Sequence, residues 1–174
     1  MIKNILIAIF FFTIILTSFC QERIPDERGF LVKDGDVAPD FTMTLTNGKT
    51  VKLSELRGKT IMLQFTASWC GVCRKEMPHI EKRIWKAYKK KGLLVYAVDK
   101  DEPKSKAKML KKQTGISYPI GLDPNSDIFG LYAEKKEGVT RNVLIDKTGK
   151  IIFLTRLFNE NEFNLLVEKI GKEF

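Results

Sequence analysis

The 174-residue sequence has few residues of the kinds that bind metals, and this limits its chemistry. It has a single histidine, His79, and three cysteines, of which only Cys70 and Cys73 form a C-x-x-C pair. A tetrahedral zinc site takes four ligands, typically from two such pairs. His79 follows Cys73 only after Pro78, so we expect it to be a surface or packing residue. The sequence therefore predicts no metal site.

The chain also has little that would cross a membrane. Its N-terminal apolar run, residues 5–16, is shorter than the about 20 residues of a membrane-spanning helix. The run follows Lys3 and precedes small and polar residues, a pattern typical of a secretory signal peptide. We predict a signal peptide over residues 1–20, a linker over residues 21–34 and one domain over residues 35–174. A lipidated Cys20, which the bulky Phe19 disfavours, and an uncleaved N-terminus are alternatives, and either would tether the protein to a membrane.

Charge is unevenly distributed, with 30 Lys and Arg against 21 Asp and Glu. The excess is concentrated in two predicted helices, residues 71–90 and 103–115. In the first of these, Ile80, Ile84 and Tyr88 recur every four residues and mark the buried stripe, which leaves the lysines outside. We therefore predict a solvated helix face and no binding of nucleic acid. An acidic lipid headgroup or an acidic partner is the alternative.

The order of predicted elements indicates an α/β fold. We expect a hairpin around Asn47-Gly48, because this dipeptide suits a tight two-residue turn. The remaining predicted elements are buried strands at 59–67 and 93–99, helices at 71–90, 103–115 and 126–134, paired strands at 140–146 and 150–156, and a final helix at 159–174. Pro78 should kink the first helix, and Ser126 should cap the short one. Alternating strands and helices give a parallel core, to which the last two strands add antiparallel edges.

The cysteine pair lies where the strand at 59–67 meets the helix at 71–90. Free N–H groups at the start of a helix stabilise a thiolate, so the pKa of Cys70 should fall below about 8.5. Cys73, one turn later, can close a disulfide with it. We predict that Cys70 attacks a target disulfide, that Cys73 resolves the mixed disulfide, and that exposed Trp69 lines the contact surface. A structural disulfide without turnover and a metal-binding or metal-delivery module are the alternatives.

The stretch "FTASWCGVCRKEMP" after a buried strand resembles the thioredoxin fold. With the hairpin, the signal peptide, "LDPNSDIFGLY" and "VLIDKTGKI", the chain is similar to TlpA/ResA-type thiol–disulfide oxidoreductases over residues 35–172. The resemblance implies a thioredoxin-like fold: a central mixed sheet flanked by helices, with an N-terminal β-hairpin. It implies a reductase of disulfides in exported proteins of the periplasm or cell envelope, in some relatives the haem-attachment cysteines of c-type cytochromes. Electrons would come from a membrane thiol donor, and no cofactor is expected.

The resemblance also assigns roles around the dithiol. Glu76 matches the carboxylate of the "CxxCxxE" pattern, which is implicated in proton transfer, although a surface helix glutamate is the plain alternative. Gln64 occupies the position of the buried Asp of ordinary thioredoxins. Because Gln cannot titrate, proton transfer would pass to Glu76, another group or water.

Thr140, after Val139, stands where the family normally has a cis-proline facing the active cysteine. A cis peptide before Thr would cost about 3–4 kcal/mol, so we expect a trans bond and a Thr140 hydroxyl beside Cys70. The active-site surface should consist of Val139 and Thr140 together with Trp69, Gly71 and Val72. The missing proline ring makes the metal-binding alternative more tenable. A thiol oxidant is a further alternative.

A thiol peroxidase is disfavoured by the residues before the dithiol. Such enzymes carry a P-x-x-x-[TS]-x-x-C pattern, and Leu63 and Ala67 occupy its proline and Thr/Ser positions. The sequence therefore favours disulfide exchange over peroxide chemistry.

Overall fold

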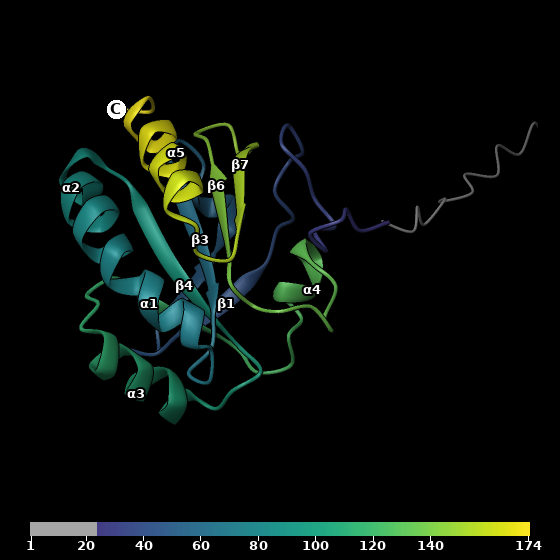
Figure 1. Cartoon of the computed structure of the whole chain (residues 1–174), viewed down its shortest axis with the longest axis vertical. Coiled ribbons are helices and arrows are strands. Elements are labelled where there is room, and N and C mark those ends of the chain that lie inside the picture. Colours follow the sequence, from purple (N-terminus) through teal and green to yellow (C-terminus); the bar gives the residue numbers. More distant parts are fainter. Residues whose placement is uncertain (1–23) are drawn as a thin grey trace, which may run out of the picture.

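The computed structural model describes residues 24–174 (Figure 1). The predicted signal peptide of residues 1–20 and the alternatives at Cys20 lie outside the described residues. Over residues 24–174, no helix combines the length and the apolar character needed to cross a membrane.

Seven strands of the described chain form one mixed sheet in the order β2-β1-β5-β4-β3-β6-β7. They are β1 (Thr42–Leu45), β2 (Thr50–Lys52), β3 (Ile61–Thr66), β4 (Leu94–Lys100), β5 (Ile120–Asp123), β6 (Arg141–Ile145) and β7 (Ile151–Arg156). The central strands β3, β4 and β5 are parallel, whereas β6 is antiparallel to β3 and β1 to β5. β1 and β2 pair antiparallel across the Asn47-Gly48 turn, in register Met43 with Val51. The predicted mixed sheet is thus confirmed.

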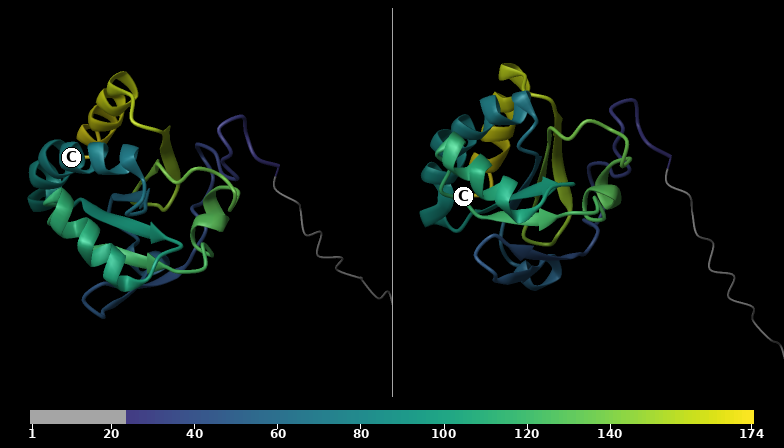
Figure 2. Two further views of the ribbon diagram at one scale, coloured as in Figure 1. Left: turned by 60° about the horizontal axis from the view of Figure 1, so that its bottom comes forward. Right: turned by 90° about the horizontal axis from the view of Figure 1, so that it is seen from below.

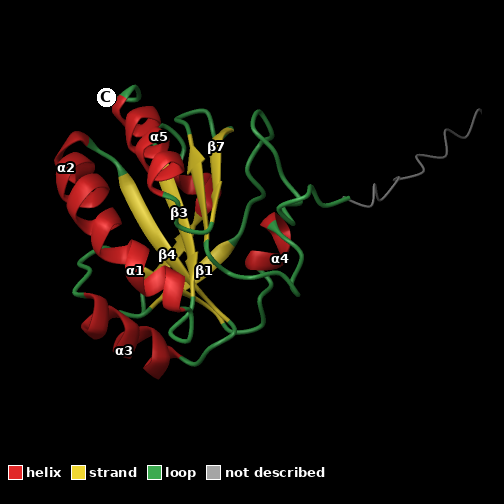
Figure 3. Cartoon of the chain, in the orientation of Figure 1, coloured by secondary structure: helices red, strands yellow, loops and turns green. Residues whose placement is uncertain are grey.

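Helices cover both faces of this sheet (Figures 1 and 3). They are η1 (Leu53–Leu56), α1 (Gly71–Ile80), η2 (Glu81–Trp85), α2 (Lys86–Tyr88), η3 (Lys89–Lys91), α3 (Lys104–Thr114), α4 (Phe129–Tyr132) and α5 (Glu160–Gly171). One core joins buried residues of α1, α3 and α5 to alternate residues of β3 and β4. The other core lies between the opposite face, α4 and the segment around Phe30. Figure 2 shows these layers from two further sides.

The chain between Gly71 and Lys91 is helical throughout, as the apolar spacing predicted. Its regular α-helical part ends at Ile80 and is followed by the π-helical turn η2. Pro78 lacks the N–H that would bond the preceding turn, so an irregularity close after it has a physical cause. Ile80 and Ile84 of the predicted stripe are fully buried, whereas its third member, Tyr88, is only half-buried.

Two local predictions were wrong. The strand β5 was missed, because Pro119 and Gly121 weaken its strand signal; Gly121 leaves room for Met43 of β1 to pack against it. Ser126 does not cap α4. The carboxylate of Asp123 instead accepts hydrogen bonds from the N–H groups of Ile128 (3.0 Å) and Phe129 (2.8 Å).

The described part of the predicted linker, residues 24–34, lies against the domain. Phe30 and Val32 are buried in the core, and Phe30 forms an isolated bridge with Ala133. The Asp26 carboxylate accepts hydrogen bonds from the N–H groups of Arg28 and Phe30, which fixes the turn before them. This segment is therefore packed on the domain rather than free of it, because its apolar side chains gain burial there.

Candidate active site

The dithiol occupies the turn between β3 and α1. Cys70 is the N-cap of α1, with extended backbone angles, and its Sγ accepts a hydrogen bond from the Cys73 N–H at 3.1 Å. The two cysteines are joined as a disulfide. After reduction, the same N–H and the positive end of the helix would face a Cys70 thiolate, the charge distribution that lowers a thiol pKa.

The two cysteines differ in solvent exposure. Cys70 is 7% exposed, whereas Cys73 is fully buried. Trp69 and Val72 beside them are 58% and 36% exposed, and Gly71 is exposed as well. An incoming disulfide can therefore reach Cys70 but not Cys73, which fits the predicted order of attack and resolution.

Thr140 lies directly across from the disulfide. Its Oγ1 is 3.2 Å from the Sγ of Cys70 and 3.2 Å from the Sγ of Cys73. The described residues contain no cis peptide bond, so the bond before Thr140 is trans, as expected. Val139 and Thr140 are both buried, which leaves the threonine hydroxyl as the group that this loop presents to the sulfurs.

Glu76 lies beneath the dithiol, one helical turn after Cys73, and is only 1% exposed. Its Oε1 accepts a hydrogen bond from Asn142 Nδ2 at 2.6 Å, and its Oε2 accepts one from Gln64 Nε2 at 3.2 Å. Burial raises the pKa of Glu76 from 4.5 to about 7, against the lowering effect of these two hydrogen bonds. The surface-glutamate alternative is therefore wrong, and the carboxyl can exchange a proton near neutral pH.

Gln64 is oriented by a third buried group. The hydroxyl of Tyr118 donates to Gln64 Oε1 at 2.7 Å, so the amide must turn its NH₂ group toward Glu76. Burial raises the pKa of Tyr118 well above its usual range, which keeps this donor protonated. Gln64 is thus fixed in the orientation that donates to the Glu76 carboxyl.

Sequence reasoning missed a second buried acid at the end of β4. Asp99 is fully buried, and no N–H or hydroxyl group within residues 24–174 donates to either of its carboxylate oxygens. Burial, with the nearby Glu102 carboxyl, raises the pKa of Asp99 from 3.8 to about 7. Glu102 accepts hydrogen bonds from the N–H and the hydroxyl of Ser68, two residues before Cys70. The available signal was an acid near the end of a buried strand, Asp99, with a second acid, Glu102, three residues later.

The residues around the dithiol do not form a metal cage. Residues 24–174 contain no group of three or more His, Cys, Asp and Glu side chains that could hold an ion. His79 packs its ring against Phe158 and Phe163, with centroids 5.0 and 6.1 Å away. The predicted packing role of His79 is thereby confirmed.

The fold and the site together define a thioredoxin-like protein with a redox-active dithiol at a helix N-terminus, and known proteins of this class match the chain. A sequence model of the AhpC/TSA family matches residues 35–154. The thiol–disulfide oxidoreductase ResA of a Bacillus cereus strain is 36% identical over 118 residues, 68% of this chain and 66% of that protein. The chain thus spans about two thirds of the length of this curated relative.

Solved structures agree with this match. The solution structure of a Bacteroides thetaiotaomicron protein, described as a candidate protein disulfide isomerase, is 57% identical with a TM-score of 0.81. It covers 83% of this chain and 92% of its own. A candidate thiol:disulfide interchange protein DsbE from Chlorobium tepidum is 31% identical with a TM-score of 0.73, over 82% of this chain and 98% of its own. The chain belongs to the AhpC/TSA family and, within it, to the thiol–disulfide oxidoreductases of the ResA type.

Proposed function

We propose that this protein is an exported protein-disulfide reductase that acts through Cys70 and Cys73. The observation that carries the proposal is the unequal access of the two cysteines at the start of α1. One sulfur can meet a macromolecular substrate, and the other is held behind it at bonding distance.

Each turnover transfers two electrons from the dithiol to the substrate. The Cys70 thiolate attacks one sulfur of the substrate disulfide, and the other substrate sulfur leaves as a thiolate that takes up a proton. The Cys73 thiol then loses its proton and attacks Cys70 Sγ, which releases the second substrate sulfur as a thiol. The Cys70–Cys73 disulfide is the oxidised end state. A membrane-bound dithiol donor would reduce it again by the same exchange in reverse.

Glu76 is the proposed acceptor of the Cys73 proton. The carboxyl is one helical turn from Cys73 and titrates near neutral pH, so it can take the proton during resolution and return it during re-reduction. Asn142 and Gln64 hold it by one oxygen each. Thr140 is proposed to hydrogen-bond whichever sulfur is a thiolate, since its hydroxyl is equally near to both.

The cellular role follows from the predicted export and the class of protein. We propose that the protein acts in the periplasm or cell envelope on disulfides of exported proteins, in cytochrome c maturation or in general thiol reduction. A signal peptide over residues 1–20 would deliver it, and an uncleaved N-terminus or a lipidated Cys20 would tether it. Export to an oxidising compartment makes the dedicated thiol donor necessary.

Substrate trapping tests the proposed attack. In Cys73→Ser the mixed disulfide on Cys70 cannot be resolved, so envelope proteins should be captured covalently and released by dithiothreitol. Cys70→Ser is the matched control, because the one thiol that it keeps, that of Cys73, is buried. Equal yields from the two variants would contradict the assignment of Cys70 as the nucleophile.

The reduction potential decides the direction of electron flow. We expect a value near or below about −250 mV, in the range of thioredoxin, when the mature protein is equilibrated in thiol redox buffers. A value near about −120 mV would make the protein a thiol oxidant and would overturn the reductase proposal.

A further inference from the structure

Arg156, the last residue of β7, lies against the loop that faces the dithiol. Its Nη1 is 3.5 Å from the carbonyl oxygen of Thr140, and the N–H of Leu157 donates to the same oxygen at 3.1 Å. A Cβ on Gly138 would stand 2.7 Å from Arg156 Nη2, so the guanidinium lies directly against this glycine. The hydroxyl of Thr140 contacts both sulfurs, so Thr140 alone lies between Arg156 and the reacting atoms.

The charge of Arg156 is not neutralised locally. Within residues 24–174, no carboxylate oxygen lies within 4.0 Å of its guanidinium. The Glu162 carboxylate accepts from the backbone N–H of Arg156 at 3.2 Å, not from its guanidinium, and it pairs with Arg28 at 3.6 Å. Arg141, opposite Arg156 in register, has a carboxylate partner of its own in Glu137 at 3.8 Å, and burial lowers the pKa of Arg141 to about 10. An ordinary salt bridge therefore does not account for the position of Arg156.

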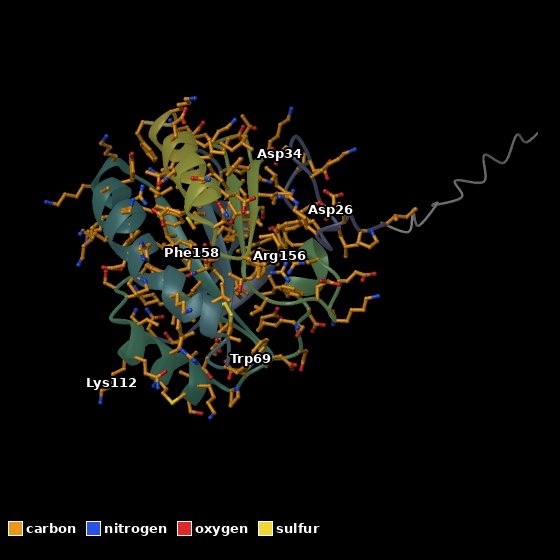
Figure 4. All side chains as sticks on the ribbon, in the orientation of Figure 1. Asp26, Asp34, Trp69, Lys112, Arg156 and Phe158 are labelled. Carbon is orange, nitrogen blue, oxygen red and sulfur yellow. A yellow bond between two sulfur atoms is a disulfide. The ribbon has the colours of Figure 1, made fainter. Side chains whose placement is uncertain are left out.

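The surroundings of Arg156 favour a polypeptide ligand. Leu157 is 50% exposed and takes a left-handed backbone (φ 65°), which is unusual for a residue other than glycine. Leu157 bonds the Thr140 carbonyl through its N–H, and Trp69 and Val72 lie next to the cysteines in the chain; all three have exposed apolar side chains, whereas Arg156 is half-buried. Figure 4 labels Arg156 and Trp69, and places Lys112 apart from them on α3.

We propose that Arg156 is a specificity-determining residue that selects disulfide substrates with an acidic side chain close to the attacked cysteine. The inference rests on the proposed reductase function and names its substrate class. As Cys70 bonds to the substrate sulfur, the substrate backbone passes the Val139–Thr140 loop, and a carboxylate near that cysteine meets the unpaired guanidinium. Arginine binds a carboxylate through two parallel N–H groups, which makes the contact directional.

The test compares two disulfide-bonded peptides that differ only in carrying Glu or Lys two residues from a cysteine. We expect the wild-type protein, supplied with a chemical reductant, to reduce the Glu peptide with at least about a fivefold higher kcat/KM at low salt. Added salt should shrink this ratio, because exposed charge pairs are screened. Arg156→Glu should reverse the preference, and Arg156→Lys should keep part of it. The ratio of the two peptides compares folded molecules only, so partial unfolding of a variant does not change it.

Lys112→Glu is the matched control, because it makes the same change of charge on exposed α3. It should leave the ratio at the wild-type value. An unchanged ratio in Arg156→Glu, or an equal change in Lys112→Glu, would overturn the inference. If the wild-type protein reduces neither peptide, the reductase proposal itself fails; if it reduces both at equal rates, only the role of Arg156 fails.

Discussion

Two buried carboxyl groups lie on the same side of the sheet, and their surroundings differ. Glu76 of α1 is held by two amide donors, whereas no N–H or hydroxyl group of the described chain donates to Asp99, near the end of β4. Burial raises the pKa of each to about 7. For Glu76 the hydrogen bonds oppose this rise, while for Asp99 the neighbouring Glu102 adds to it.

These different surroundings suit the two buried acids to different roles. A carboxyl with neutral amide donors on both oxygens keeps one orientation in both protonation states, as a proton acceptor for Cys73 requires. A carboxyl beside another carboxyl is stable chiefly when the two share a proton. Glu102, next to Asp99, therefore suits the fixing of the Ser68 turn before Cys70, and Glu76 suits proton transfer.

The largest expected effect comes from Glu76→Gln, which removes the titrating group but keeps the shape of the side chain. Turnover should fall by about 10²-fold near neutral pH, the usual contribution of a positioned proton acceptor. The pH profile of Cys70 alkylation in the reduced protein should also shift. Glu160→Gln, at an exposed glutamate of α5, is the control. An unchanged alkylation profile would remove Glu76 from the mechanism.

Asn142→Leu tests whether the amide donors are what distinguishes Glu76 from Asp99. The substitution removes the 2.6 Å hydrogen bond to Glu76 and should destabilise the fold by about 1–3 kcal/mol, with the larger loss above pH 7. It should also raise the pKa of Glu76, since a donor to the charged form is lost. Urea unfolding at pH 5 and pH 8 measures the difference. Equal losses at both pH values would show that the amide does not act on the carboxylate.

Asp99→Asn should have a smaller effect of the opposite sign. Folding raises the pKa of Asp99 from 3.8 to about 7, so its contribution to stability is complete below about pH 3.8 and is lost as the pH rises through 7. Removal of the charge should therefore stabilise the protein by about 1 kcal/mol above pH 7 and leave it unchanged near pH 4. Urea midpoints across this pH range provide the check. A uniform stabilisation would mean that the charge is not the cause.

The smallest expected effect belongs to Thr140→Val, which removes the hydroxyl from both sulfurs and keeps the branched shape. Loss of one hydrogen bond to a thiolate should raise the pKa of Cys70 and slow its alkylation a few-fold at pH 7. Thr140→Ser should retain the wild-type rate. A rate for Thr140→Val equal to that of wild type would leave the threonine with a packing role alone.

Prediction from the sequence succeeded where the signal was local. Cys70 and Cys73 lie one turn apart, Gly115 ends α3 in a left-handed conformation, and the Asn47-Gly48 turn joins two strands. The position of Thr140 beside Cys70 was also predicted, although only through the family resemblance. The strand β5 was missed because Pro119, Gly121 and Asp123 are residue types that are rare in strands.

The partners of the site residues had no local signal. Asn142 and Glu76 are separated by 66 residues, and Arg156 reaches Thr140 across 16. Such contacts depend on which strands are neighbours: β6 lies beside β3, which sets Asn142 opposite Gln64 in register. Neither the types of these two residues nor their spacing in the sequence predicts that Asn142 and Gln64 lie side by side.

The sequence by itself thus determined the reactive pair, the helix that begins at it and the alternation of strands and helices, because these depend on residues close together in the chain. Only the tertiary structure decided which carboxyl is buried with amide donors, which is buried with a second acid, and which arginine contacts the loop that faces the dithiol. Burial and charge act through space, and the distances through space are fixed by the order and register of the strands.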